Sequence, residues 1–135
     1  MTMFNTKGLM TSKRQDWRTP TIIYDELHKE FNFDYDPCIL ASDTIHPKDM
    51  LGSDWTGKNI YVNPPYNKLG QWIKKCYDEW KKGKKVVMLI PARTDTKAFH
   101  EYIYNQAEIR FIKGRLCFND SGKPAPFPSM IVIFR

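Results

Sequence analysis

The chain has 135 residues, and its 21 Lys and Arg residues outnumber 15 Asp and Glu residues, giving a formal charge of +6. At this length a two-domain enzyme is excluded, and a hydrophobic content of 41% excludes a disordered tail. The longest apolar run, residues 86–90, is too short to span a membrane, and no secretory leader pattern opens the chain. We therefore expect one small, basic, soluble domain in the cytoplasm.

The cysteines and histidines show no metal-binding pattern. The three cysteines are far apart, with no Cys-x-x-Cys motif and no Cys/His pair at zinc spacing. The three histidines are isolated from one another and from any nucleophile. The sequence therefore predicts no metal site and favours a reducing compartment over secretion.

In chain order, residues 1–15 are expected to form a flexible arm and residues 16–135 a single domain. A helix is predicted to begin at Thr19 and Pro20, because threonine caps helix N-termini and proline is tolerated at the first helical position. The apolar face of this helix repeats every four residues at Ile23, Leu27 and Phe31. Residues 32–36 alternate apolar and polar side chains and predict a short strand.

The middle of the chain predicts a polar loop over residues 42–57, then two strands that flank a helix. The strands cover residues 59–62 and 86–90, and the second is apolar throughout, as in a strand covered on both faces. The intervening helix stops at Gly83, and its apolar stripe consists of Leu69, Trp72, Ile73, Cys76, Tyr77 and Trp80.

The end of the chain predicts a third helix and two closing strands. The helix contains Phe99, Tyr102 and Ile103, with Thr94 or Asp95 as its cap. The strands cover residues 108–112 and 130–134 and are separated by a Gly- and Pro-rich loop. This order of elements predicts an α/β fold with a mostly parallel sheet, in which ligands bind beyond the carboxyl ends of the strands.

The segment Asn63–Tyr66 reads Asn-Pro-Pro-Tyr and directly follows a predicted strand. Two consecutive prolines hold the backbone in a rigid extended turn. The Asn63 side chain and the Pro64 backbone each offer a carbonyl acceptor, which suits a substrate amino group with two N–H bonds to donate. Tyr66 offers a flat ring for an unstacked base. The alternative is a plain turn with Tyr66 packed beneath it, but the position between a strand and an amphipathic helix favours function.

In their order and spacing, several segments resemble the phage-type DNA N6-adenine methyltransferases, which are relatives of the (Asp/Asn/Ser)-Pro-Pro-(Tyr/Phe/Trp) amino-methyltransferases. The segments are Asp16–Pro20, Asp36–Cys38, Asn63–Tyr66, Ile90–Arg93, Gly114–Phe118 and the closing strand, so the resemblance covers nearly the whole chain. It implies a compact Rossmann-like fold without a separate target-recognition domain. It further implies methyl transfer from S-adenosylmethionine to the N6 amino group of adenine in DNA.

The resemblance also implies roles for individual residues. The catalytic residues would be Asn63, Pro64, Pro65 and Tyr66, and the cofactor-binding residues Trp17, Thr19, Pro20, Asp36, Pro37, Cys38, Asp49 and Asn63. Thr19 and the helix start would hold the methionine carboxylate, and Asp36 would accept from the ammonium group. Other readings stay open, with Thr19 as a plain helix cap, Asp36 as a turn cap and Asp49 as a solvated loop acid.

The implied DNA-binding residues are Lys13, Arg14, Arg18, Arg93 and Arg115. Because the adenine amino group is unreachable inside a duplex, the base would be flipped out and stacked on Tyr66. Arg93 reads equally well as a member of a surface ion pair, and Arg115 as an ordinary loop arginine. The lysines within residues 74–85 favour a solvated helix face over a phosphate-binding surface.

The chain departs from the wider pattern in one respect, because no Phe-x-Gly-x-Gly loop follows Cys38 and the next glycine is Gly52. The resemblance implies a monomer or homodimer encoded by a phage or prophage. One alternative is a non-catalytic nucleic-acid-binding protein that keeps the methyltransferase shell. Another is a methyltransferase for a cytosine amino group, RNA or a protein glutamine, since the turn recognises an amino group rather than a particular ring.

Overall fold

The computed structural model describes residues 18–38 and 47–135, without the side chains of residues 47–49. The predicted arm and the residues Lys13, Arg14 and Trp17 lie outside these ranges. The helical elements are α1 (Thr21–Phe31), α3 (Pro47–Gly52), η2 (Tyr66–Lys68), α4 (Leu69–Lys81), η3 (Phe99–Ile103) and η4 (Phe118–Asp120). The strands are β1 (Asn59–Val62), β2 (Lys85–Pro91), β3 (Glu108–Phe111) and β4 (Ser129–Phe134).

The four strands form a mixed sheet in the order β1-β2-β4-β3. β1 and β2 run parallel, while β4 runs antiparallel to both β2 and β3. The expected mostly parallel sheet is therefore corrected to a mixed one. The physical reason is that the segment between β3 and β4 contains only the short η4 and no crossover helix along the sheet, so the chain doubles back and pairs Phe111 with Met130 in antiparallel strands. β4 is inserted between β2 and β3, so β1, β2 and β3 still share one direction.

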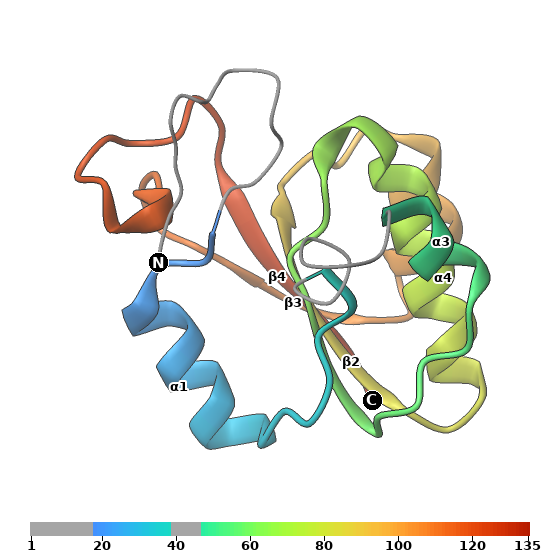
Figure 1. Cartoon of the computed structure of the whole chain (residues 1–135). Helices are drawn as coiled ribbons and strands as arrows, with labels where there is room; N and C mark the ends of the chain where they lie inside the picture. Colours follow the sequence, from blue (N-terminus) through green and yellow to red (C-terminus); the bar gives the residue numbers. More distant parts are fainter. Residues whose placement is uncertain (1–17, 39–46) are drawn as a thin grey trace.

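Helices cover both faces of the sheet, with α1 on one side and α4 and α3 on the other (Figure 1). Strand side chains alternate between these two cores. In β2, Met88 and Ile90 pack on the α4 side with the fully buried Trp72, whereas Val87 and Leu89 pack on the α1 side with Leu27. The apolar stripes predicted for α1 and α4 therefore do face the core.

Two helix starts differ from the prediction. α1 begins at Thr21, and Pro20 occupies its N-cap position without a side-chain cap, so Thr19 does not cap the helix. η3 is a π-helix, and the hydroxyl of Thr96 accepts the Phe99 N–H at 3.3 Å in place of a cap from Thr94 or Asp95. At neither helix start does the residue predicted as the cap accept the hydrogen bonds of the first backbone N–H groups.

The predicted strand over residues 32–36 is reduced to one parallel bridge between Tyr35 and Ile60. Asn32, at a φ of 55°, ends α1 in the left-handed conformation, which leaves few extended residues before the chain turns away. The predicted loop over residues 42–57 contains α3. The other predicted strands are confirmed to within one residue, and the predicted stop of α4 is confirmed by Gly83, which has a φ of +101°.

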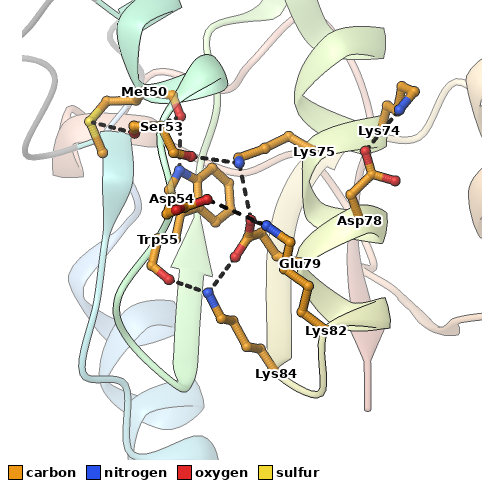
Figure 2. A network of polar contacts seen from close by, with 10 residues as sticks. All are labelled: Met50, Ser53, Asp54, Trp55, Lys74, Lys75, Asp78, Glu79, Lys82 and Lys84. Atoms are coloured by element: carbon orange, nitrogen blue, oxygen red, sulfur yellow. Dashed lines mark hydrogen bonds and ion pairs between the residues drawn. The ribbon is translucent and has the colours of Figure 1, made fainter.

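A buried carboxylate fixes the segment between α3 and β1 onto α4 (Figure 2). Glu79 is fully buried and accepts hydrogen bonds from Lys75, Lys82 and Lys84. Two of these lysines also bind backbone carbonyls of that segment, Lys75 at Ser53 and Lys84 at Trp55. Several lysines of residues 74–85 therefore have structural partners on and around the helix.

Candidate active site

The parallel part of the sheet brings the two main sequence motifs together at one edge. Tyr35 bridges Ile60, and the Tyr61 N–H donates to the Tyr35 carbonyl at 3.0 Å. Asp36–Cys38 and Asn63–Tyr66 therefore leave neighbouring segments in the same direction. Both motifs therefore lie at the carboxyl edge of β1.

The Asn63 side chain belongs to a short chain of hydrogen bonds on the α1 face. Its Nδ2 donates to Thr19 Oγ1 at 3.1 Å, and Thr19 Oγ1 lies 2.6 Å from the Tyr61 hydroxyl. Tyr61 precedes Asn63 by two positions, so alternation along β1 places both side chains on the same face. Sequence reasoning missed Tyr61, although this two-residue spacing on a strand was the available signal.

Asp36 lies close to these groups and carries the site's negative charge. Burial raises the pKa of Tyr61 well above its usual value, and the nearby Asp36 carboxylate adds to the rise. Burial also raises the pKa of the Cys38 thiol, again with a contribution from Asp36, so this thiol stays protonated. Asp36 Oδ1 accepts the Cys38 N–H at 3.0 Å, which is the turn-capping contact expected of an aspartate here.

Tyr66 follows the extended Pro65 (φ −63°, ψ 140°) and begins η2. Its ring is half-buried and lies perpendicular to that of Phe127, with the ring centroids 5.2 Å apart. Burial raises the pKa of Tyr66, and the positive charge of Arg93 opposes this rise, so Arg93 is a near neighbour. Phe127 also contacts Phe118 at 6.0 Å between centroids. Sequence reasoning missed Phe127, an aromatic residue within a Pro-rich loop.

The loop between β3 and β4 holds the start of α1. The Arg18 N–H donates to Asn119 Oδ1 at 3.0 Å, and the Asn119 N–H donates back to the Arg18 carbonyl at 2.9 Å. Asp120 accepts from Thr21 twice, from the backbone N–H at 3.2 Å and from the hydroxyl at 2.6 Å. Both loop residues have positive φ, 61° and 51°, which Asn and Asp tolerate better than most residues. Thr19 is thereby held beside Asn63.

The remaining predicted residues are placed as follows. Pro20, Pro37 and Pro64 are buried, and Asp49 lies in α3 with its side chain outside the described atoms. Arg18, Arg93 and Arg115 are exposed, and Arg93 follows the carboxyl end of β2. Across residues 18–38 and 47–135, no group of three or more His, Cys, Asp or Glu side chains is arranged to hold a metal ion. None of the helices in these ranges is long and apolar enough to cross a membrane.

Comparison with known proteins decides the family. A family model described as DNA N-6-adenine-methyltransferase (Dam) matches residues 6–135. The chain belongs to this family. The resemblance drawn from the sequence motifs is thereby confirmed, and Dam membership makes the chain an enzyme that methylates the N6 amino group of adenine in DNA.

Two phage proteins resemble this Dam-family chain. A DNA N-6-adenine-methyltransferase of Haemophilus phage HP1 is 32% identical to this chain over an alignment of 149 positions. The alignment covers 99% of this chain and 84% of that protein. A DNA N-6-adenine-methyltransferase of Escherichia phage T1 is 36% identical over 64 residues, which cover 46% of this chain and 27% of that protein. No solved structure gives a significant match.

Proposed function

We propose that this Dam-family enzyme takes its methyl group from S-adenosylmethionine and that Asn63 and Pro64 bind the adenine amino group. The orientation of the Asn63 amide carries this proposal. Because Nδ2 donates to Thr19, the amide oxygen is turned away from Thr19 and can serve as an acceptor at the carboxyl end of β1. An amino group with two N–H bonds needs two acceptors, and the Pro64 carbonyl is the second.

Methyl transfer to the adenine amino nitrogen depends mainly on the positioning of the reacting atoms. The lone pair of the adenine amino nitrogen is delocalised into the ring, so hydrogen bonds from both N–H groups to Asn63 and Pro64 favour a pyramidal, more nucleophilic nitrogen. When bound, the cofactor supplies an electrophilic methyl group on a sulfonium sulfur. No covalent enzyme intermediate is needed, because holding the acceptor nitrogen in line with that methyl group supplies much of the acceleration.

The cofactor would lie between Asp36 and Thr19, whose chemistry suits its two charged ends. The Asp36 carboxylate would accept from the ammonium group, and the Thr19 hydroxyl would donate to the carboxylate. Asp120 already binds the Thr21 N–H, so that helix-start donor is not available to the same carboxylate. The residues assigned to this site remain those proposed from the sequence: Trp17, Thr19, Pro20, Asp36, Pro37, Cys38, Asp49 and Asn63.

We propose that the flipped adenine stacks on the ring of Tyr66. The Phe127 ring is perpendicular to that of Tyr66 and would form a second aromatic wall of the site. Arg18, Arg93 and Arg115, together with Lys13 and Arg14, would contact the DNA backbone. The mixed sheet would then be a reduced Rossmann-like core within a single domain over residues 16–135. The enzyme would act as a monomer or homodimer in the cytoplasm of a bacterial host.

The test is methyl transfer from labelled S-adenosylmethionine to unmethylated DNA, followed by nucleoside analysis. The wild-type protein should yield N6-methyladenine, and Asn63→Ala should slow transfer by about 100-fold, as expected for the loss of a group that orients the reacting atom. Asn67→Ala removes an exposed asparagine from the same turn and should leave the rate unchanged.

The outcomes separate the alternatives. Equal labelling by the wild-type protein and Asn63→Ala would remove Asn63 from the mechanism. A methyl group on the cytosine amino group, or on RNA or protein instead of DNA, would change the acceptor. Salt-sensitive DNA binding without heat of cofactor binding in calorimetry would indicate a non-catalytic DNA-binding protein.

A further inference from the structure

The connection between β3 and β4 is much longer than the two strands require. It spans residues 112–128 (the β3–β4 loop), whereas adjacent antiparallel strands are commonly joined by about two to five residues. Loops of this length in compact domains are usually either functional or disordered. The β3–β4 loop is not disordered, because its own contacts fix it to the domain.

Buried side chains and two tight turns give the β3–β4 loop a fixed shape. Leu116, Phe118 and Ala125 are buried in the core on the α1 side of the sheet, and the Ala125 N–H donates to the Leu116 carbonyl at 2.8 Å. Gly114 and Gly122 have φ values of +79° and +77°, which glycine adopts without strain. The loop is therefore already folded before any partner binds.

The end of the β3–β4 loop borders the candidate active site. The ring of Phe127 contacts that of Tyr66, and the Ala92 N–H donates to the Pro128 carbonyl at 2.9 Å, just beyond the carboxyl end of β2. Figure 1 shows the loop beyond the start of β4, on the side of α1. A DNA strand that delivers a base to Tyr66 must therefore pass close to this loop.

The two turns of the loop carry positive charges that the fold does not use. Lys113 and Arg115 lie on either side of the first glycine, Lys123 follows the second, and all three are exposed. In the described part of the chain, none of these three side chains forms a hydrogen bond or an ion pair. The single acidic residue of the loop, Asp120, is engaged by Thr21.

Exposed cations elsewhere in the molecule have acidic partners. Those within ion-pair distance of a carboxylate include Lys74 with Asp78, Lys82 with Glu79, Lys97 with Glu101 and Arg110 with Glu30. The charges of the β3–β4 loop are therefore unusual in being uncompensated. Uncompensated cations on a surface beside a base-binding site fit a phosphate backbone, because each neutralised phosphate releases condensed counterions.

We propose that the β3–β4 loop binds the DNA backbone next to the flipped adenine, with Lys113, Arg115 and Lys123 each contacting a phosphate group. This inference rests on the proposed position of the adenine at Tyr66, and it adds Lys113 and Lys123 to the DNA-binding residues. Phosphate contacts fix the position of the strand but do not read its sequence. The loop therefore supplies part of the DNA affinity, while Asn63 and Pro64 select the amino group.

The first measurement compares Lys113→Gln and Lys123→Gln with Lys58→Gln and Lys85→Gln. The control lysines are also exposed, but they lie at the amino ends of β1 and β2, at the opposite edge of the sheet. Binding to a fluorescein-labelled, unmethylated duplex is followed by anisotropy over a range of salt concentrations. Each loop variant should bind about eightfold more weakly at 0.1 M salt and lower the slope of log affinity against log salt by about 0.9, as for one lost phosphate contact. The control variants should stay within about twofold of wild type.

The second measurement asks whether charge, rather than side-chain shape or sequence reading, is responsible. Lys113→Arg and Lys123→Arg keep the charge and should keep the wild-type affinity and salt slope. The loss in each glutamine variant should be equal for duplexes of different sequence. A loss confined to one sequence would show that the lysine reads a base edge and would overturn the phosphate contact.

The results for the loop and for the proposed function are distinct. Failure of the wild-type protein to form N6-methyladenine from S-adenosylmethionine, or full activity of Asn63→Ala, contradicts the proposed function whatever the loop variants do. If the loop variants bind DNA like wild type, or lose no more affinity than Lys58→Gln and Lys85→Gln, only the role of the β3–β4 loop is overturned.

Discussion

Gly57 helps to position the candidate site because it has no side chain. A Cβ built on it would overlap the Tyr35 Cβ and lie 2.6 Å from Asp34 Oδ1. Asp34 in turn accepts the N–H groups of Lys58 and Asn59, each at 3.0 Å. Glycine therefore lets the segment that carries Asp36 lie directly against the start of β1.

Replacement of Gly57 by alanine should push Tyr35 away from β1 and displace Asp36. We expect Gly57→Ala to lower the free energy of unfolding by about 1–3 kcal/mol, the usual cost of overpacking, and to raise the KM for cofactor. Denaturant unfolding and steady-state kinetics measure the two effects. Gly52→Ala is the matched control, since no atom lies within 4 Å of its added methyl group. Equal stability of the two variants would contradict this account.

At the scale of elements, the start of α1 depends on a loop distant in sequence. Pro20 provides no side-chain cap, and Asp120, 99 positions away from Thr21, supplies the acceptor instead. Hydrogen bonds from Thr21 hold the pKa of Asp120 below its usual value, so the carboxylate is charged at neutral pH. A negative charge at a helix N-terminus also complements the helix dipole.

Asp120→Ala should release the start of α1 and, with it, Thr19. We expect the midpoint of thermal unfolding to fall by about 2–5 °C, as for the loss of a helix cap in a domain of this size. Circular dichroism during heating gives the midpoint. Asp25→Ala removes an exposed acid from α1 itself and should leave the midpoint unchanged or slightly raised. A midpoint for Asp120→Ala equal to that of Asp25→Ala would exclude the capping role.

At the scale of the whole molecule, Glu79 joins the α4 layer to the segment that leads into β1 (Figure 2). Burial alone would raise the pKa of Glu79, but hydrogen bonds from Lys84, Lys82 and Lys75 outweigh it and lower the pKa from 4.5 to about 2. A carboxylate whose pKa is lower in the folded state stabilises the fold fully above its unfolded pKa. That stabilisation is lost as the pH falls from about 4.5 to about 2.

Glu79→Gln should therefore lower the free energy of unfolding at neutral pH by about 3 kcal/mol, because it leaves partly buried lysines without a counter-charge. The same variant should show a weaker loss of stability between pH 4.5 and pH 2, since the titrating group is gone. Denaturant titrations over this pH range measure both effects. Asp78→Asn, which breaks an exposed pair with Lys74, should cost at most about 1 kcal/mol. An unchanged pH profile for Glu79→Gln would rule out this explanation.

The elements with local signals were predictable from the amino-acid pattern. The stripe of α4 and the apolar run of β2 were readable because helical and strand periodicities depend only on neighbouring residues. The Asn63–Tyr66 turn was readable because two prolines restrict the backbone wherever they stand. Together with the family resemblance, these patterns located the carboxyl edge of the sheet and predicted adenine methylation.

The tertiary structure alone decided the direction of β4, the true cap of α1 and the partners of Asn63. Each depends on contacts between distant positions, such as Thr19 and Asn63, which are 44 positions apart. The local pattern of threonine before proline predicts Thr19 as a helix cap. In the folded chain Thr19 Oγ1 instead lies 2.6 Å from the buried Tyr61 hydroxyl and 3.1 Å from Asn63 Nδ2, two partners that are distant from it in sequence.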